Sequence, residues 1–400
     1  MASKKASNRN LSDAKNAKND EFYTQYHDIE KEINAYLEYN KDVFRDKTIL
    51  LPCDDPEWSN FTKYFAQNFE ALGLKKLIST SYAVESKQYK EGYQPSLFEV
   101  NEPRYDEYKT RRNGKIFTLT RDINNDQNIN IEDLEWDYLQ GDGDFRSDEV
   151  KNLRYEADII ITNPPFSLFR EFLAWIVEAK KDFVIIGNMN AITYKEVFPL
   201  IKENKMWLGP SITSGDREFG VPDYYPINAA GWRIDNEGNK YIRVKGVRWF
   251  TNIDHGRRHE PLPLMTMEDN IKFNTRLKGQ EYQKYDNYDA IEVPFTNAIP
   301  SDFDGAMGVP ISFLDKYNPD QFEILGATQR GCHDEVPDIK KYDDYWEVRQ
   351  NGERTGSSGG KTNENANLEG NDGKKNYFIN NKGHIIQSVY QRIFIKHKRG

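Results

Sequence analysis

The chain has 400 residues, of which 37% are hydrophobic and 13% aromatic, and its formal net charge is −9. This length predicts two domains, and the aromatic content argues against a disordered chain. No apolar run approaches the ~20 residues that span a bilayer, and the polar N-terminus is unlike a signal peptide, so we expect no membrane association. The two cysteines, Cys53 and Cys332, form no metal-binding or disulfide pattern, which fits a reducing cytoplasm.

Basic residues gather in three segments despite the acidic total. Residues 381–400 hold five basic residues and no acidic one. Residues 239–260 hold six basic and two acidic residues, and residues 1–18 hold five basic residues and one acidic residue. Local positive charge can guide a protein to a polyanion such as DNA, although the same residues can form an ordinary solvated surface. The candidate DNA contacts are Lys245, Arg248, Arg257, Arg258, Arg392 and Lys396.

The N-terminal part of the chain passes from a polar arm to a helix and a strand. Residues 1–19 are polar, and we expect them to form a flexible arm. Over residues 27–44, apolar residues recur at the spacing of one helix face. Residues 48–51 form a short apolar run that is typical of a buried strand.

A second helix and a second strand follow. Asp55 is expected to cap this helix, Pro56 suits its first position, and Gly73 ends it. Residues 76–79 are typical of the next strand. A strand, a helix and a strand joined by short connections predict the start of a doubly wound α/β sheet.

The region over residues 84–135 is polar and irregular, and we expect an insertion without regular structure. Within it, residues 122–133 partly match a calcium-binding loop, with oxygen-bearing side chains at several ligand positions. Gln127 replaces the glycine that such a loop needs for its turn, and no clear helices flank it. A polar loop is therefore the favoured interpretation, and we expect no metal.

The next strand leads into the most informative segment of the chain. Residues 157–162 are typical of a buried strand and run directly into Asn163-Pro164-Pro165-Phe166, which we call the NPPF motif. Ser167 is expected to cap the following helix, whose apolar residues form one face. Residues 183–187 predict another buried strand.

The C-terminal part gives weaker patterns. Residues 241–253 are typical of a late strand or half of a hairpin. After about residue 260 the periodicity weakens, and the glycine- and asparagine-rich residues 350–378 predict a mobile loop. Strand-like alternation returns at residues 384–396.

The residue types of the NPPF motif suit methyl transfer to a planar amine. Open α/β sheets bind ligands beyond the carboxyl ends of their strands, where this motif lies. The Asn163 side-chain oxygen and the Pro164 carbonyl can each accept an amine hydrogen, which localises electron density on the attacking nitrogen, while the prolines fix the backbone. Phe166 offers a face for stacking on a base that has left its duplex. The alternative is a plain turn that ends a strand, but the placement between a strand and a helix favours chemistry.

Two acidic segments are candidates for holding the methyl donor, a sulfonium cofactor. Asp54 and Asp55 follow the first strand, where they could hold an amino acid moiety, although Asp55 could simply cap a helix. Residues 141–145 (GDGDF) precede the strand of the NPPF motif. There Asp142 or Asp144 beside Phe145 could bind an adenine ring, although an acidic turn is an equally good interpretation.

At these residues the chain resembles the EcoRI-type adenine-specific DNA methyltransferase family. The resemblance spans most of the chain, and its N-terminal segments are the most specific. The matching segments are residues 20–26 (DEFYTQY), 53–56 (CDDP) with 59–61 (SNF), 163–167 (NPPFS), and 308–310 (GVP) with 313–317 (FLDKY).

The resemblance implies an α/β, Rossmann-like fold that uses S-adenosylmethionine, with a C-terminal target-recognition region. We expect a catalytic domain over residues 20–260 and a target-recognition, DNA-binding region over residues 261–400. The resemblance also implies that Phe22, Tyr23 and Thr24 close over the cofactor, and that Cys53 joins Asp54 and Asp55 in its site. The chain departs from the wider methyltransferase pattern, because its first strand leads into CDDP instead of a glycine-rich turn, and no acid ends its second strand.

Together these observations predict methylation of the N6 amine of a flipped adenine in duplex DNA, for restriction-modification or for protection of phage or host DNA. We expect a bacterial or phage-encoded protein in the cytoplasm; a cognate restriction endonuclease without a stable complex stays open. One alternative is methylation of another planar amine: cytosine N4, RNA adenine or a protein glutamine. The other is a non-catalytic DNA-binding relative, which the missing glycine turn favours.

Overall fold

The computed structural model describes residues 23–52, 54, 59–83, 103–213, 215–221, 231–328, 336 and 339–398. Three predicted cofactor contacts, Phe22, Cys53 and Asp55, lie outside these residues. The chain divides into two compact units, residues 1–189 with 208–256, and residues 190–207 with 257–400. In the described part of the chain, no helix is both long and apolar enough to cross a membrane.

The first unit is built on an eight-stranded mixed sheet whose order is β5-β4-β3-β2-β6-β7-β12-β8. The strands β3, β2, β6 and β7 at its centre run parallel, and β4, β5 and β12 are antiparallel to their neighbours. Their bounds are β2 Thr48–Leu51, β3 Lys76–Ser81, β4 Lys115–Leu119, β5 Glu135–Tyr138, β6 Ile159–Thr162, β7 Asp182–Asn188, β8 Trp207–Leu208 and β12 Val247–Thr251.

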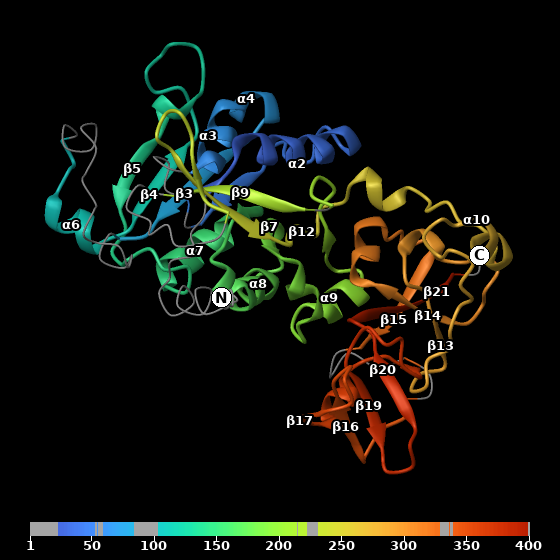
Figure 1. Cartoon of the computed structure of the whole chain (residues 1–400). Coiled ribbons are helices and arrows are strands. Elements are labelled where there is room, and N and C mark those ends of the chain that lie inside the picture. Colours follow the sequence, from blue (N-terminus) through green and yellow to red (C-terminus); the bar gives the residue numbers. More distant parts are fainter. Residues whose placement is uncertain are drawn as a thin grey trace. The chain divides into compact units, whose positions relative to one another are not determined.

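Helices cover both faces of this sheet. Figure 1 shows α2, α3 and α4 over one face and α7 and α8 over the other, and α6 follows the residues drawn in grey. This arrangement matches the doubly wound α/β pattern expected from the sequence. The helix bounds are α2 Tyr26–Tyr39, α3 Asn60–Gln67, α4 Phe69–Leu72, α6 Glu107–Arg112, α7 Asp148–Glu156 and α8 Phe169–Glu178.

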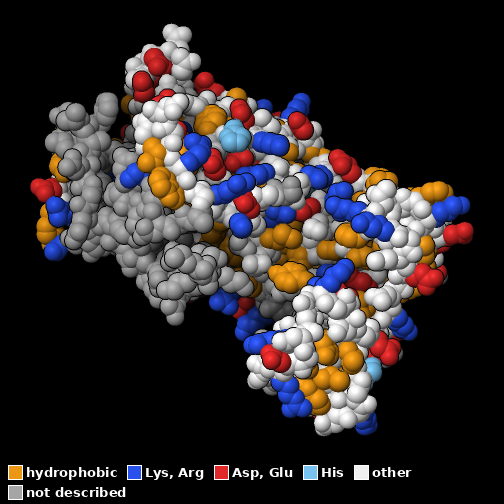
Figure 2. Space-filling view, viewed as in Figure 1, with side chains coloured by type: hydrophobic (Ala, Val, Ile, Leu, Met, Phe, Trp, Pro, Cys, Tyr) orange, Lys and Arg blue, Asp and Glu red, His pale blue; other side chains and the backbone are white. Residues whose placement is uncertain are grey.

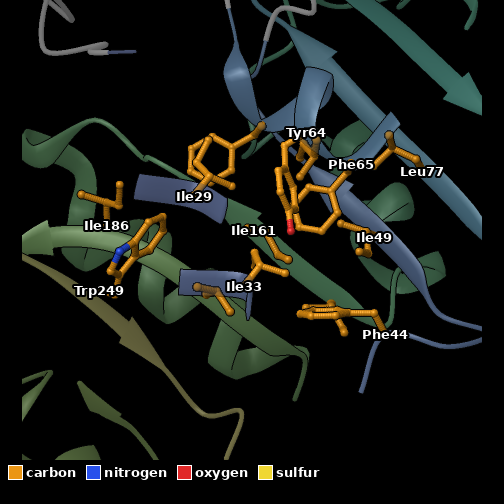
Figure 3. Packing of buried hydrophobic residues seen from close by; sticks show 14 of the residues in the cluster. Ile29, Ile33, Phe44, Ile49, Tyr64, Phe65, Leu77, Ile161, Ile186 and Trp249 are labelled. Atoms are coloured by element: carbon orange, nitrogen blue, oxygen red, sulfur yellow. The ribbon is translucent and has the colours of Figure 1, made fainter. Parts of the chain in front are cut away.

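The core of the first unit lies between the sheet and α2 and α3. Ile49 and Ile161 point from β2 and β6 toward Ile33 and Phe65 (Figure 3). All four side chains are nearly or completely buried. Trp249 of β12 extends this cluster toward α3, because its ring meets the edge of Phe61 at 6.0 Å. This packing fixes the position of β6, the strand that leads into the NPPF motif.

A smaller antiparallel sheet in the same unit has the order β1-β9-β11-β10. Its strands are β1 Tyr23–Thr24, β9 Asp216–Val221, β10 Arg233–Ile234 and β11 Lys240–Lys245. Phe219, Val221 and Ile242 of this sheet belong to the core described above. The sheet therefore packs against the large sheet's helical layer and brings the N-terminal strand β1 into the first unit.

The second unit contains two sheets. One has the order β13-β14-β21-β15 and the other β17-β16-β19-β20-β18. The bounds are β13 Ala290–Glu292, β14 Ala306–Pro310, β15 Phe322–Ala327, β16 Tyr345–Val348, β17 Arg354–Ser358, β18 Asn367–Glu369, β19 Tyr377–Asn380, β20 Ile385–Ser388 and β21 Arg392–His397, with the helices α9 Phe198–Lys202 and α10 Met267–Phe273.

Several local expectations were wrong, and each has a physical reason. Helix α3 begins at Asn60, and its cap is Ser59, whose hydroxyl accepts from the Phe61 amide at 3.1 Å, rather than Asp55. Ser167 does not cap helix α8, because it lies within a short 3-10 helix that precedes α8. The N-cap residue of α8 is Leu168. Residues 84–135, expected to lack regular structure, contain α6 and β4, and β5 begins at their end; β4 pairs with β3 and β5 with β4, so these two strands extend the edge of the large sheet.

Two C-terminal expectations also differ from the structure. The single strand predicted over residues 241–253 is two strands in different sheets, with Gly246 between them at a φ of +69°. The loop predicted over residues 350–378 contains β17, a 3-10 helix at Gly359–Glu364 and β18. The glycines that suggested a loop serve the turns between these short elements, as the positive φ angles of Gly352, Gly370 and Gly373 show.

Replacing Ile161 by alanine tests the role of this core. Ile161 is fully buried, so its loss should lower the free energy of unfolding by about 2–5 kcal/mol through lost burial and a residual cavity. Val177→Ala on the exposed face of α8 is the control, with an expected change within about 0.5 kcal/mol. Urea unfolding followed by tryptophan fluorescence measures both, and equal changes in the two variants would contradict the assigned packing.

Candidate active site

The candidate site lies where the parallel strands of the large sheet end. Strands β2 and β6 pair in parallel, with Leu50 opposite Ile160, so their carboxyl ends meet at one edge. The Thr162 hydroxyl donates to the Pro52 carbonyl at 3.0 Å and ties the two strand ends together. Asp54 therefore follows β2 close to the point where Asn163 follows β6, at the edge where open α/β sheets bind ligands.

The NPPF motif occupies the turn between β6 and α8. Pro164 and Pro165 are buried, whereas Asn163 and Phe166 are half-buried. Pro165 has a φ of −51° and a ψ of 124°, and its carbonyl accepts from the Leu168 amide at 2.9 Å. The two prolines and this bond define the path of the backbone, so the acceptors on Asn163 and Pro164 are held in place before any ligand binds.

Phe166 is positioned by the smaller sheet. Its ring meets the Phe219 ring of β9 edge-on, with 6.5 Å between the centroids. Phe219 is itself buried, so it forms a fixed support for a half-buried ring. A supported, partly accessible aromatic ring can stack on a planar ligand at little cost in conformational freedom.

Asp54 is held by hydroxyl groups from two neighbouring elements. The Ser59 hydroxyl donates to Oδ1 of Asp54 at 2.8 Å, and the Ser79 hydroxyl of β3 donates to the Asp54 carbonyl. The Thr62 hydroxyl lies 3.0 Å from that of Ser79 and completes the group. Asp54 is 8% exposed, so its carboxylate has a defined orientation at the strand edge.

The predicted cofactor segment Tyr23-Thr24 reaches the same region. Thr24 lies opposite Phe219 in the antiparallel pairing of β1 with β9. Its carbonyl accepts from the Asn60 side chain at 2.7 Å, which ties β1 to the start of α3, directly after Ser59. The structure thus brings this segment next to the residues that hold Asp54.

The acidic loop at residues 141–145 packs against the end of β3. The Ala83 amide donates to the Asp142 carbonyl at 2.8 Å. Gly143 has a φ of +84°, and a Cβ at this position would clash with the Ser81 carbonyl oxygen. Only glycine fits this approach without strain, so Gly143 places the acidic side chains of the loop beside the strand edge.

The acids of this loop are linked to one another and to Arg146. Oδ1 of Asp142 accepts from the Asp144 amide at 3.1 Å, and the Asp144 carboxylate pairs with Arg146 at 2.7 Å. Hydrogen bonds with Asp144 raise the pKa of the Arg146 guanidinium above its usual value. Glu171 of α8, the helix that follows the NPPF motif, also pairs with Arg146 at 3.2 Å. Arg146 therefore links the Asp144 carboxylate to this helix.

Phe145 does not fit its predicted role. Its ring is 1% exposed and packs against the rings of Phe172 and Trp175 at 5.1 and 5.7 Å. An adenine could not stack on a ring enclosed in this way. Phe145 instead anchors the acidic loop to α8.

The acids of the calcium-like segment bind its own backbone. Asp122 accepts from the amides of Asn125 and Gln127, and Asp133 accepts from those of Ile123, Asn124 and Asn130. Over the described residues, no group of three or more histidine, cysteine, aspartate or glutamate side chains could hold a metal ion. The carboxylates of Asp122 and Asp133 thus organise the backbone of this loop.

Three of the six candidate DNA contacts are engaged within the protein. Arg248 is buried and donates to the carbonyls of Val247 and Thr213. Arg258 is buried over the Trp207 ring, and Arg392, whose side chain is 12% exposed, forms an ion pair with the buried Glu292. We withdraw these three as candidate contacts, because burial and internal partners keep them from a phosphate backbone.

The other three candidates differ in their surroundings. Lys245 is exposed at the end of β11, and Arg257 is half-buried. Lys396 is 45% exposed and pairs with Glu323 at 3.0 Å. On the face drawn in Figure 2, basic and acidic side chains are intermixed, so charge alone does not outline a footprint for DNA there.

Sequence reasoning missed the residues that support the site. Ser59 carried a recognisable signal, because a serine before an apolar helix is a common cap. Ser79, Arg146 and Phe219 carried none, since each acts through a contact that only the folded chain creates. No acid ends the second strand, as expected from the sequence: β3 ends in Thr80 and Ser81.

The chain is similar in sequence to known methyltransferases. The family model described as adenine-specific methyltransferase EcoRI matches residues 10–398. The chain is 47% identical to the type II methyltransferase M.EcoRI of Escherichia coli over 80% of this chain and 89% of that protein. It is 33% identical to M.MpnI of Mycoplasma pneumoniae, over 78% and 83%, and 34% identical to M.MgeORF184P of Mycoplasma genitalium, over 78% and 84%. No solved structure matches the chain.

The family match and the similarity to M.EcoRI show a methyltransferase that acts on DNA adenine. The chain belongs to the EcoRI adenine-specific methyltransferase family. The resemblance inferred from the sequence is therefore confirmed. Membership of a methyltransferase family implies S-adenosylmethionine as the methyl donor.

Exchanging the loop glycines tests whether the acidic loop belongs to the site. Gly143→Ala should shift the loop away from β3, lower stability by about 1–3 kcal/mol and weaken S-adenosylmethionine binding by about tenfold or more. Gly141→Ala is the matched control, because a Cβ there meets nothing within 4 Å. Calorimetric titration with the cofactor measures both, and unchanged affinity in Gly143→Ala would remove the loop from the site.

Proposed function

We propose that this enzyme transfers a methyl group from S-adenosylmethionine to the N6 amine of an adenine flipped out of a specific duplex DNA site. The observation that carries this proposal is the NPPF motif at the carboxyl end of β6, tied to the segment of Asp54 through Thr162 and Pro52. In that arrangement, a planar amine and a methyl donor can bind side by side at the ends of adjacent strands. Family membership supports adenine as the base.

The motif acts on the amine through acceptors and a stacking surface. The Asn163 side-chain oxygen and the Pro164 carbonyl each accept one amine hydrogen. Both bonds strengthen as positive charge develops on the nitrogen, so they stabilise the transition state more than the ground state. Phe166, supported by Phe219, stacks on the extruded base and holds its ring plane.

The acids around the strand edge suit S-adenosylmethionine. When bound, this cofactor supplies an electrophilic methyl group on a sulfonium. Its amino and hydroxyl groups are hydrogen-bond donors, and Asp54, Asp142 and Asp144 offer carboxylate acceptors at the edge. Tyr23 and Thr24 complete this predicted contact set, with Phe22, Cys53 and Asp55 from the sequence, and no metal is required.

We assign the two units different tasks. The first unit would be a Rossmann-like catalytic domain, close to the predicted residues 20–260, and the second would recognise the DNA target. Residues 190–207 precede the predicted boundary but group with the second unit. Lys245, Arg257 and Lys396 stay as candidate DNA contacts. The bacterial relatives, which are named type II methyltransferases, support a role in restriction-modification within a bacterial cytoplasm.

Analysis of modified bases tests the proposed reaction. Purified protein, S-adenosylmethionine and unmethylated bacterial DNA should yield N6-methyladenine after digestion and mass spectrometry. Modified-base sequencing of the same DNA should place the label at one recurrent sequence, as expected of a site-specific enzyme. N4-methylcytosine, label in RNA or protein alone, or cofactor binding without any product would each refute the proposal in favour of a named alternative.

Replacing Asn163 by alanine tests the role of the motif. Loss of one acceptor should lower kcat by about 100-fold or more, with S-adenosylmethionine affinity largely kept. Asn236→Ala, an exposed residue of the β10–β11 turn in the same unit, should retain the parent activity. Single-turnover methylation assays measure the effect, and parent-like turnover in the Asn163 variant would contradict the assigned role.

A further inference from the structure

A cluster of basic side chains lies on and beside helix α6 of the first unit. Residues 104–112 hold four basic residues and two acidic ones, in a chain whose net charge is −9. The four basic side chains are all exposed, and we call them the α6 cluster: Arg104, Lys109, Arg111 and Arg112. A local excess of positive charge attracts a polyanion even when the protein as a whole is acidic.

The two acids of this segment do not cancel the cluster. Asp106 is the N-cap residue of α6, and its carboxylate accepts from the Lys109 amide at 3.0 Å. Glu107 pairs with Arg111 at 3.6 Å, and both of these side chains are more than 60% exposed. An exposed pair of this kind contributes little free energy, so Arg111 can exchange Glu107 for a phosphate group.

Strand β5 supports α6 with one of its faces and carries its acids on the other. The Tyr138 hydroxyl accepts from the Asp106 amide at 3.0 Å and lies 2.7 Å from the Thr110 hydroxyl. Glu135 and Asp137 alternate with Tyr138 along the strand, so they point away from the face that contacts α6. The helix is therefore fixed to the sheet, and these two acids lie on the far side of the strand.

Helix α6 lies at the same edge of the large sheet as the NPPF motif. Strand β4 begins shortly after α6, and its first residue, Lys115, is paired with Ser81 at the carboxyl end of β3. Asn113, the residue after α6, donates from its side chain to the carbonyls of Leu139 and Gln140 at 2.8 and 2.9 Å. These contacts join the end of the helix to the segment that leads into the acidic loop at residues 141–145.

The α6 cluster is within reach of a duplex that delivers a base to the NPPF motif. In the order of the sheet, β4 is three strand spacings away from β6, or about 14 Å. Duplex DNA carries one phosphate charge for about every 1.7 Å of its axis, so a bound duplex presents many phosphates over this distance. The cluster and the motif both belong to the first unit, so this reach involves that unit alone.

We propose that the α6 cluster binds the phosphate backbone of the duplex beside the target adenine. This inference rests on the proposed function, which places that adenine at the NPPF motif. Guanidinium groups suit phosphate because they donate in a planar fork, and the Lys109 ammonium adds a compact charge. The Tyr108 ring, which is 62% exposed, lies 4.3 Å from the Arg112 guanidinium and keeps it at the surface. Contacts of this kind hold a duplex in register but carry no sequence information.

A charge-removing variant tests the contact. The triple variant Lys109→Gln, Arg111→Gln and Arg112→Gln should weaken duplex binding by about 10-fold or more, equally with and without the target site. The slope of log K against log salt concentration should become shallower by about 0.9 for each lost phosphate contact. Fluorescence anisotropy over a salt series measures both quantities. Affinity for S-adenosylmethionine should be kept, which shows that the variant is folded.

A matched variant removes the same charge from the opposite edge of the same sheet. Lys41, Lys75 and Lys180 are exposed in the connections that lead into β2, β3 and β7, so they lie at the amino ends of these strands. Their triple exchange for glutamine should leave the affinity for DNA and the salt slope as in the parent protein. Equal effects of the two triple variants would reduce the α6 cluster to a share of the overall charge and would overturn the proposal.

The remaining outcomes also decide the matter. Parent-like affinity in the α6 variant, or weaker binding with an unchanged salt slope, would show that the cluster makes no phosphate contact. Arg111→Gln alone should make the slope shallower by about one, so the test survives if the triple variant is unstable. Absence of N6-methyladenine with the parent protein, or parent-like turnover in Asn163→Ala, would instead refute the proposed function, because neither result depends on α6.

Discussion

The parallel pairing of β2 with β6 is the constraint on which the rest of the site depends. It places Asp54 and Asn163 after adjacent strand ends, and the bond from Thr162 to Pro52 locks those ends together. Several other supporting contacts act on one of these two segments. Ser59 and Ser79 hold Asp54, and Phe219 supports the ring of Phe166. A methyl donor and an acceptor amine must meet in line, so the spacing of two paired strands is a natural template for this reaction.

The first unit shows how a departure from the usual glycine-rich turn can be accommodated. The segment after β2 is rich in acids, and its carboxylate and carbonyl are held by three hydroxyl side chains from α3 and β3. Close backbone approach at a glycine occurs instead at Gly143, on the neighbouring strand edge. The segment after β2 thus supplies acidic side chains, and the loop around Gly143 supplies the close approach of one backbone to another. The missing glycine-rich turn is therefore compatible with an active methyltransferase.

Much of the first unit could be predicted from the sequence, because its buried strands are continuous apolar runs and the apolar residues of its helices recur at helical spacing. The strands at residues 48–51, 159–162 and 182–188 were found in this way. The strands β4 and β5 were missed since they lie at the polar edge of the sheet, where alternation is weak. Arg392 was expected to contact DNA, because the sequence shows that a side chain is charged but not which side chain it pairs with. Its partner, the buried Glu292, lies far away along the chain.

The most direct test of this account is a crystal structure of the protein with S-adenosylhomocysteine and a duplex containing its target site. The account predicts an extrahelical adenine whose N6 amine lies within hydrogen-bond distance of the Asn163 side-chain oxygen and the Pro164 carbonyl. It also predicts that the homocysteine or adenosine groups contact Asp54 at the end of β2. An adenine that stays in the helix, or a cofactor bound away from this strand edge, would contradict it.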